Sequence, residues 1–310
     1  PSLVGSEMCI RDSFLYISML FHFSFKSKFF VIFFCHILLL GILPYLVYIS
    51  FMKKFWIITL LLTAGCQTIA VPPEFSYKRI ETSDFTLASW QKISNPEAVY
   101  KIYIEGDGYA FDAHGYPSAN PTPHGTLVRE LAFGDPSPNV LYLPRPCQYV
   151  MSTICAPRHW TTARFAPEII NAEFAAVKQI AGKHQIILVG FSGGAQIAGL
   201  ISAAKTGLNI KKIITIGGNL DHTSWTAYHN VIPLSESLNL ENYRKQFAQI
   251  PQHHYVGEND TVIPPKLVQN FVMNNSLITI VANASHSEGW QPIYPLIWNC
   301  LLYTSDAADD

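Results

Sequence analysis

The stretch that decides the fold is Gln185-Ile-Ile-Leu-Val-Gly-Phe-Ser-Gly-Gly-Ala195, in the second half of a 310-residue chain. Residues 185–189 form a continuous apolar run, which is typical of a parallel strand buried on both faces. Residues 194–205 have the apolar spacing of a helix. A turn this tight between strand and helix requires unusual backbone angles at Ser192, and glycines at 190 and 194 let neighbouring segments approach closely.

Strands and helices alternate on both sides of this stretch. Residues 75–93 have the pattern of two antiparallel strands. Further strands are expected at 100–104, 139–143, 212–216, 254–256 and 277–281, and further helices at 126–132, 167–181, 240–249 and 265–273. This order predicts an α/β fold with a mostly parallel central sheet flanked by helices. Ligands of such sheets bind beyond the carboxyl ends of the strands.

Composition excludes two classes of protein. The chain has 21 basic and 22 acidic side chains, a net charge of −1, so it has no basic excess to bind the phosphates of a nucleic acid. With 49% hydrophobic and 14% charged residues, it is not a disordered chain. The spacing of its Cys and His residues does not indicate a metal site.

The serine of the glycine-rich turn needs a base to act as a nucleophile near neutral pH. His286 follows the last expected strand by five residues, in Ala-Ser-His-Ser-Glu-Gly, where a loop can bring its imidazole over the sheet. His222, His253 and His254 are alternatives, but the last two open a strand at its amino end, which is the wrong edge. We therefore expect His286 to be the base.

The base needs a carboxylate that accepts its second ring N–H and stabilises the imidazolium. Asp260 lies in Gly257-Glu-Asn-Asp-Thr-Val-Ile-Pro264, just after an expected strand. Glu258 is two residues earlier and still leaving that strand. Asp221, after the preceding strand, is the alternative acid. We expect Asp260 to fill this role.

An acyl-transfer reaction also needs N–H donors for the developing oxyanion. The amide of Gly193, directly after the serine, is one candidate. The second is expected from the loop Glu105-Gly-Asp-Gly108, through the amide of Gly106 or Asp107.

In the order Ser192, Asp260, His286, these residues resemble the catalytic triad of the α/β-hydrolase superfamily, over about residues 75–290. The stretches that carry a further resemblance, to bacterial α/β-hydrolases with a lipoprotein signal, are Tyr-Ile-Glu-Gly-Asp-Gly108, Arg145-Pro-Cys-Gln-Tyr149, Gly-Phe-Ser-Gly-Gly194 and Gly218-Asn-Leu-Asp-His222. The resemblance implies a serine hydrolase that cleaves small carboxylic esters through an acyl-enzyme, with no cofactor.

Other functions on this fold stay open. A thioesterase or a peptidase uses the same residues, and a non-catalytic envelope binding protein would not bring the three together. Residues 221–252 form a short insertion that could be a small cap over the site. Aromatic residues that could line a pocket, or equally pack in the core, are Trp225, Tyr228 and His229 in this insertion and Tyr109, Phe111, Tyr116 and Trp160 elsewhere.

Residues 52–66 resemble a bacterial lipoprotein signal. Met52-Lys-Lys54 is a short basic segment, an apolar run follows, and Leu62-Thr-Ala-Gly-Cys66 ends it with small residues before a cysteine. Cys66 would be the lipidated residue that binds the membrane. Because Gln67 follows it, the resemblance favours the periplasmic face of the outer membrane.

The remaining segments frame one domain at 72–299. Residues 1–51 are interpreted as a non-native flank or leader, with a transmembrane helix at 29–51 as the alternative, and residues 300–310 as a non-native tail. Within the domain, Cys147 and Cys155 are separated by seven residues, and in an oxidising compartment such a pair is expected to form a disulfide.

Overall fold

The computed structural model describes residues 70–300. The chain divides into two compact units, Pro1–Ala70 and Val71–Asp310, and only the second is described below. The expectations for residues 1–51, for the signal at 52–66 with Cys66, and for residues 301–310 lie outside the described residues. Within residues 70–300, no helix is both long and apolar enough to cross a bilayer.

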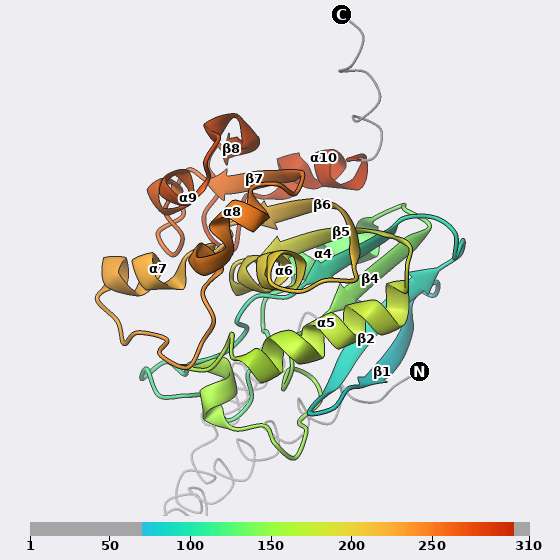
Figure 1. Cartoon of the computed structure of the whole chain (residues 1–310), viewed down its shortest axis with the longest axis horizontal. Helices are drawn as coiled ribbons and strands as arrows, with labels where there is room; N and C mark the ends of the chain where they lie inside the picture. The colour runs from blue at the N-terminus through green and yellow to red at the C-terminus, as the bar shows by residue number, and fades with distance from the viewer. Residues whose placement is uncertain (1–69, 301–310) are drawn as a thin grey trace, which may run out of the picture. The chain divides into compact units, whose positions relative to one another are not determined.

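An eight-stranded sheet forms the centre of the described part, in the order β1-β2-β4-β3-β5-β6-β7-β8 (Figure 1). The first two strands pair antiparallel with each other, β2 also pairs antiparallel with β4, and all other pairs are parallel. The strands are β1 (Ser76–Glu81), β2 (Thr86–Ile93), β3 (Tyr100–Ile104), β4 (Asn139–Leu143), β5 (Gln185–Phe191), β6 (Asn209–Ile216), β7 (Gln252–Gly257) and β8 (Ile278–Val281). The predicted α/β architecture is confirmed.

Helices cover both faces of the sheet. In Figure 1, α5 (Pro167–Ala181) and α6 (Gly193–Ala203) lie in front of it. Helix α4 (Leu127–Gly134) packs on the opposite face, where α10 (Tyr294–Trp298) joins it through a hydrogen bond from the Trp298 indole to the Leu131 carbonyl. The other helices are α7 (His222–His229), α8 (Arg244–Phe247) and α9 (Pro265–Phe271), with short 3-10 segments η2 (Pro157–Trp160), η3 (Leu240–Tyr243), η4 (Asn275–Leu277) and η5 (Gln291–Ile293).

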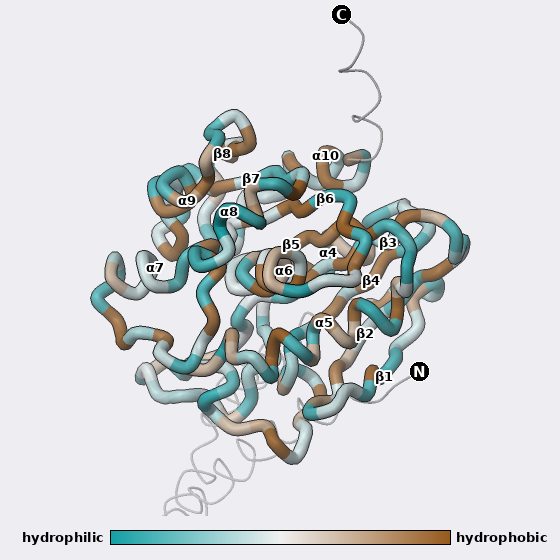
Figure 2. Tube along the Cα trace, in the orientation of Figure 1, coloured by the Kyte–Doolittle hydropathy of each residue, from teal (hydrophilic) through white to brown (hydrophobic). Residues whose placement is uncertain are grey.

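The apolar run that begins the deciding stretch is the central strand β5. It lies between β3 and β6, and residues 186–189 are at most 1% exposed. Figure 2 shows hydrophobic residues along the central strands. Ile102 and Leu188 belong to the large core on the α5 and α6 side, whereas the alternate residues Lys101 and Tyr103 point to the other face.

Besides α10 and the short 3-10 segments, which were not predicted, two elements between β6 and β7 differ from the expectation. The helix predicted at 240–249 is a 3-10 turn, η3, continued by the four-residue helix α8. Helix α7 was not predicted, because its sequence His-Thr-Ser-Trp-Thr-Ala-Tyr-His has no apolar stripe and buries only His222 and Thr226. Asp221 caps its first turn and Asn230, with a φ of 52°, ends it. Helix α7, η3 and α8 make up the insertion between β6 and β7, and of its residues Trp225 lines the pocket described below.

Candidate active site

Ser192 occupies a strained turn between β5 and α6. Its φ is 51° and its ψ is −120°, a left-handed conformation that is uncommon for a residue with a side chain. Three backbone hydrogen bonds hold the turn. The Ser192 N–H donates to the Ile216 carbonyl at 3.0 Å, and the Ser192 carbonyl accepts from the N–H groups of Asn219 at 3.0 Å and Ala195 at 3.1 Å. The sharp turn expected from the sequence is present, and it raises the serine hydroxyl above the carboxyl edge of the sheet.

Glycines on either side make this turn sterically possible. A Cβ atom on Gly190 would lie 2.6 Å from the Cα of Ala195, and one on Gly194 would lie 2.5 Å from the carbonyl oxygen of Ile104. Real Cβ atoms do not approach backbone this closely, so a larger residue at either position would push α6 away from the sheet. The close approach expected at 190 and 194 is confirmed.

Three residues far apart in the chain form one hydrogen-bonded row. His286 Nε2 lies 3.0 Å from Ser192 Oγ, and His286 Nδ1 lies 2.8 Å from Asp260 Oδ2. The Asp260 side chain is fully buried, and its Oδ1 accepts hydrogen bonds from the N–H groups of Val262 and Ile263. The carboxylate is thereby fixed in orientation, and the structure brings together the three residues expected to act as nucleophile, base and acid.

Asp221, the alternative acid, serves another purpose. Its carboxylate accepts hydrogen bonds from the N–H groups of Thr223 and Ser224 and from the Asn239 side chain, and it has no contact with His286. It is the N-cap of α7. Glu258 likewise turns away from the row, because its Oε2 accepts a hydrogen bond from the Asn283 N–H.

The alternative histidines lie elsewhere. His253 contacts the Thr279 hydroxyl, and His254 is buried between the Thr215 hydroxyl and the Gln252 side chain. Burial lowers the pKa of His254 to about 3, so it remains neutral. His222 is buried against Phe165, and within residues 70–300 neither of its ring nitrogens has a hydrogen-bond partner.

The expected oxyanion donors need one correction. The N–H of Gly106 donates to the carboxylate of Glu105 at 2.8 Å and is therefore engaged. The N–H groups of Asp107 and Gly193 donate to no other group in the described part of the chain. Gly106 itself packs on the nucleophile, since a Cβ built on it would lie 3.3 Å from the Ser192 Cβ. Of the two amides expected from this loop, only that of Asp107 remains available.

A pocket of about 740 Å³ opens onto Ser192 and His286. Three of the seven aromatic residues considered from the sequence, Tyr109, Phe111 and Trp225, line it. The others do not: Trp160 is buried in the core, Tyr116 and Tyr228 are exposed, and His229 Nε2 donates to the Val262 carbonyl. The described residues contain no group of three or more His, Cys, Asp or Glu side chains that could hold a metal ion.

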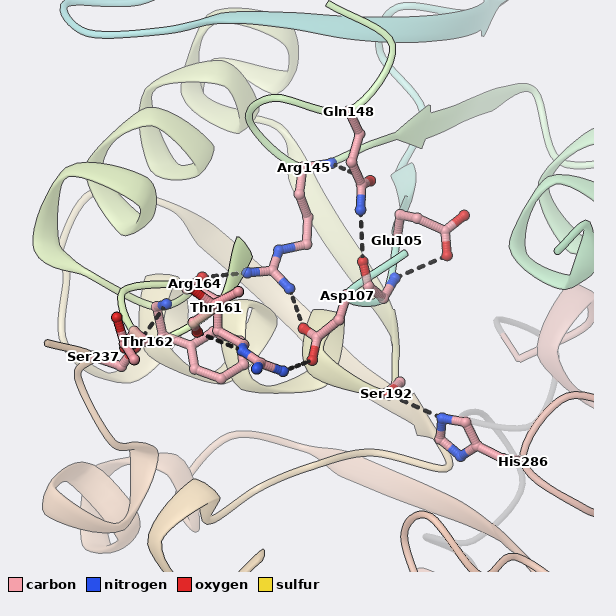
Figure 3. A network of polar contacts seen from close by, with 12 residues as sticks. Glu105, Asp107, Arg145, Gln148, Thr161, Thr162, Arg164, Ser192, Ser237 and His286 are labelled. Carbon is pink, nitrogen blue, oxygen red and sulfur yellow. Dashed lines mark hydrogen bonds and ion pairs between the residues drawn. The ribbon is translucent and has the colours of Figure 1, made fainter. Parts of the chain in front are cut away.

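A polar network beside the nucleophile was not predicted from the sequence. Figure 3 shows the Asp107 carboxylate between the guanidinium groups of Arg145 and Arg164. Burial alone would raise the pKa of Asp107, but the two arginines outweigh it and leave this pKa below its ordinary value. The only sequence signal was the stretch Arg145-Pro-Cys-Gln-Tyr149, to which no role had been assigned.

A disulfide joins Cys147 of this stretch to Cys155, the pairing expected for an oxidising compartment.

Comparison with known proteins agrees with this geometry. Residues 157–286 match the family Serine hydrolase (FSH1). A candidate lipase from Acinetobacter baumannii AYE superposes with a TM-score of 0.53 at 12% identity, covering 77% of this chain and 98% of the other. An esterase from Pyrococcus furiosus gives a TM-score of 0.50 at 18% identity, with 76% and 92% covered. No curated protein matches the sequence. The chain therefore has the α/β-hydrolase fold, and its residues 157–286 match a family of serine hydrolases.

Proposed function

We propose that this chain is a serine hydrolase that cleaves carboxylic esters through an acyl-enzyme. The observation that carries the proposal is the unbroken hydrogen-bonded row from Ser192 through His286 to the buried Asp260. In this row the histidine has one ring nitrogen at the hydroxyl and the other at a carboxylate, which is the arrangement that a general base requires. Ser192 and His286 of this row line a pocket large enough for a small substrate.

The reaction would follow from these positions. As Ser192 Oγ attacks the ester carbonyl carbon, its proton passes to His286 Nε2, and the carbonyl electron pair moves onto oxygen. The N–H groups of Gly193 and Asp107 would hold this oxyanion, and Asp260 would stabilise the imidazolium. When the intermediate collapses, the alkoxide leaves with the proton from His286. A water molecule, deprotonated by the same imidazole, then releases the acid from Ser192.

The pocket supports an ester with a short or aromatic acyl group. Phe111, Phe191 and Trp225 supply apolar surface beside Ser192, and much of the remaining lining is also apolar, including Leu127, Val128 and Val262. A thioester or a peptide could be cleaved by the same groups, so the substrate panel must include all three bonds.

Activity-based labelling tests the proposal directly. Wild-type protein should react with a fluorophosphonate probe, and the Ser192→Ala variant should not. Unlabelled protein from the same preparation is then assayed on p-nitrophenyl esters of increasing chain length, a matched thioester and a peptide anilide. A folded wild-type protein that takes up no probe would contradict the proposal and favour a non-catalytic binding role.

We further propose that the enzyme works in the bacterial cell envelope, anchored at the periplasmic face of the outer membrane by lipid on Cys66. The support is the signal-like sequence at 52–66 together with the disulfide between Cys147 and Cys155, a bond that persists in oxidising compartments. Radiolabelled palmitate should be incorporated into the full chain and lost on Cys66→Ser. Incorporation that survives this substitution would contradict the anchor.

A further inference from the structure

A negative charge lies beside the proposed oxyanion site. The Asp107 carboxylate reaches over Gly193, so that a Cβ atom on that glycine would collide with Asp107 Oδ1. Asp107 and Gly193 are the two residues whose amides remain available for an oxyanion. A carboxylate this close to a developing negative charge opposes its formation, most strongly in a partly desolvated site.

Two arginines reverse this charge. Arg145 Nη1 pairs with Asp107 Oδ1, and Arg164 Nη1 pairs with Asp107 Oδ2. The arginine side chains are only 5% and 7% exposed, so solvent screens them little. One carboxylate and two guanidinium groups sum to a net charge of about +1 at neutral pH, since arginine does not lose its proton. The cluster therefore favours an oxyanion that Asp107 alone would repel.

The arginines are themselves held in place (Figure 3). Arg145 Nη2 donates to the Arg164 carbonyl, and Arg164 Nε donates to the Thr161 carbonyl at 2.7 Å. The Arg145 guanidinium also lies 5.0 Å from the centre of the Phe165 ring. Each arginine thus meets Asp107 with a fixed orientation, and together they hold the carboxylate from both sides.

The loop that carries Arg145 supports the backbone of the oxyanion loop as well. Gln148 Nε2 donates to the Gly106 carbonyl, and Gln148 Oε1 accepts from the Arg145 N–H, both at 3.0 Å. Cys147 and Tyr149, on either side of Gln148, have φ values of 72° and 61°. Such strained backbone persists only where surrounding contacts over-determine it. Here those contacts include the disulfide from Cys147 to Cys155 and the hydrogen bonds of Gln148.

We infer that Arg145 and Arg164 are positioning residues of the hydrolytic reaction. They fix the Asp107 carboxylate so that its backbone N–H faces the oxyanion, and they change the charge behind that site from negative to positive. Neither touches the reacting atoms. The inference rests on the proposed serine-hydrolase function and adds to it a role for the stretch 145–149.

A charge cycle at Arg164 and Asp107 tests this. Arg164→Gln reduces the cluster to a net charge of zero and should lower kcat/KM for a p-nitrophenyl ester by about 10- to 100-fold, less than the 10²–10³ lost with a direct oxyanion donor. Affinity for a trifluoromethyl ketone, whose adduct with Ser192 carries the oxyanion, should fall in parallel, while KM stays within about 3-fold.

The double variant Arg164→Gln with Asp107→Asn restores the net charge of +1 and keeps the Asp107 N–H. It should therefore recover most of the activity lost by Arg164→Gln, a coupling that additive damage to the fold cannot produce. Arg164→Lys retains the positive charge but not the planar guanidinium group, so its kcat/KM should lie between those of wild type and Arg164→Gln. This variant replaces Arg164→Gln in the test if the Gln variant does not fold. Arg244→Gln, a matched change on α8, should leave activity unchanged.

The outcomes separate the two proposals. If wild-type protein is labelled at Ser192 but Arg164→Gln and Arg164→Lys bind the trifluoromethyl ketone as wild type does, the positioning role is wrong and the hydrolase function stands. A double variant that is no better than Arg164→Gln also overturns the role. A folded wild type that is never labelled overturns the hydrolase function and this inference with it.

Discussion

Asp260 Oδ2 lies 2.8 Å from His286 Nδ1, and the opposite oxygen of the same carboxylate accepts two backbone N–H groups. The carboxylate therefore cannot rotate away from the imidazole without losing hydrogen bonds in a buried site, where unsatisfied groups are costly. This relationship distinguishes Asp260 from Asp221, whose oxygens accept hydrogen bonds from the first turn of α7 and from the Asn239 side chain.

The two aspartates should respond differently to substitution. Asp260→Asn is expected to lower kcat by about 10⁴-fold with little change in KM, because the amide favours the wrong imidazole tautomer. Asp221→Ala should leave kcat within about 2-fold and lower the free energy of unfolding by about 1–2 kcal/mol through loss of the helix cap. Steady-state kinetics and urea denaturation of both variants measure this. The reverse pattern would assign the acid to Asp221.

The disulfide between Cys147 and Cys155 should affect both stability and rate. It closes a loop with a sequence separation of 8, so replacing both cysteines by serine should cost about 2–3 kcal/mol of unfolding free energy. It should also lower kcat, since Arg145 and Gln148 belong to the loop that it anchors. Wild type treated with dithiothreitol should come to resemble the double serine variant, and that variant should not respond to the reagent. Equal kcat with and without the disulfide would contradict the link to the oxyanion loop.

Glu173 should make stability depend on pH. Its carboxyl group is fully buried on α5 with no hydrogen-bond partner among residues 70–300, and burial raises its pKa from 4.5 to about 8. Between these pH values the unfolded chain has released the proton that the folded protein still holds. The contribution of Glu173 to the free energy of unfolding is therefore complete below pH 4.5 and lost as pH rises to about 8.

The Glu173→Gln variant, which cannot ionise, should not show this loss. Relative to wild type, its free energy of unfolding should increase steadily from about pH 5 to about pH 8 and then level off, because the wild-type group titrates over that window. Chemical denaturation at several pH values measures the difference. Glu97→Gln, at an exposed position, is the control and should follow wild type. A difference that does not change with pH would show that Glu173 is already ionised in the folded protein.

Lys101 should be needed to hold the last helix on the sheet. Its ammonium lies 2.8 Å from Asp135 Oδ2 and donates to the carbonyls of Ile297 and Trp298 at the end of α10. Lys101→Met would leave the buried carboxylate without its cation, at a cost of about 3–5 kcal/mol. Lys183→Met, on the exposed surface, should change stability by less than about 0.5 kcal/mol. Thermal and urea unfolding measure both; a small loss for Lys101 would mean that other contacts suffice for α10.

The amino-acid sequence by itself determined the elements of this protein and the order in which they occur. Apolar runs and helical spacing are local properties, so β4 and α5 have the predicted bounds. The glycine-rich turn at Ser192 was predicted from a local motif too, although part of the steric limit at Gly194 comes from the distant carbonyl of Ile104. Where the pattern was weak, as in α7 with its single cap and no apolar stripe, local information did not suffice.

Only the tertiary structure decided how separate segments meet. The sequence left the amides of Gly106 and Asp107 as equal candidates, and the choice depends on the Glu105 side chain, which engages the first. Arg164 contacts Asp107, which lies 57 residues away in the sequence, and no periodic pattern of residue types indicates such a contact. Charges and hydrogen bonds act between whatever groups the fold brings close, so the electrostatic environment of the nucleophile follows from the packing of distant loops and not from any one stretch of sequence.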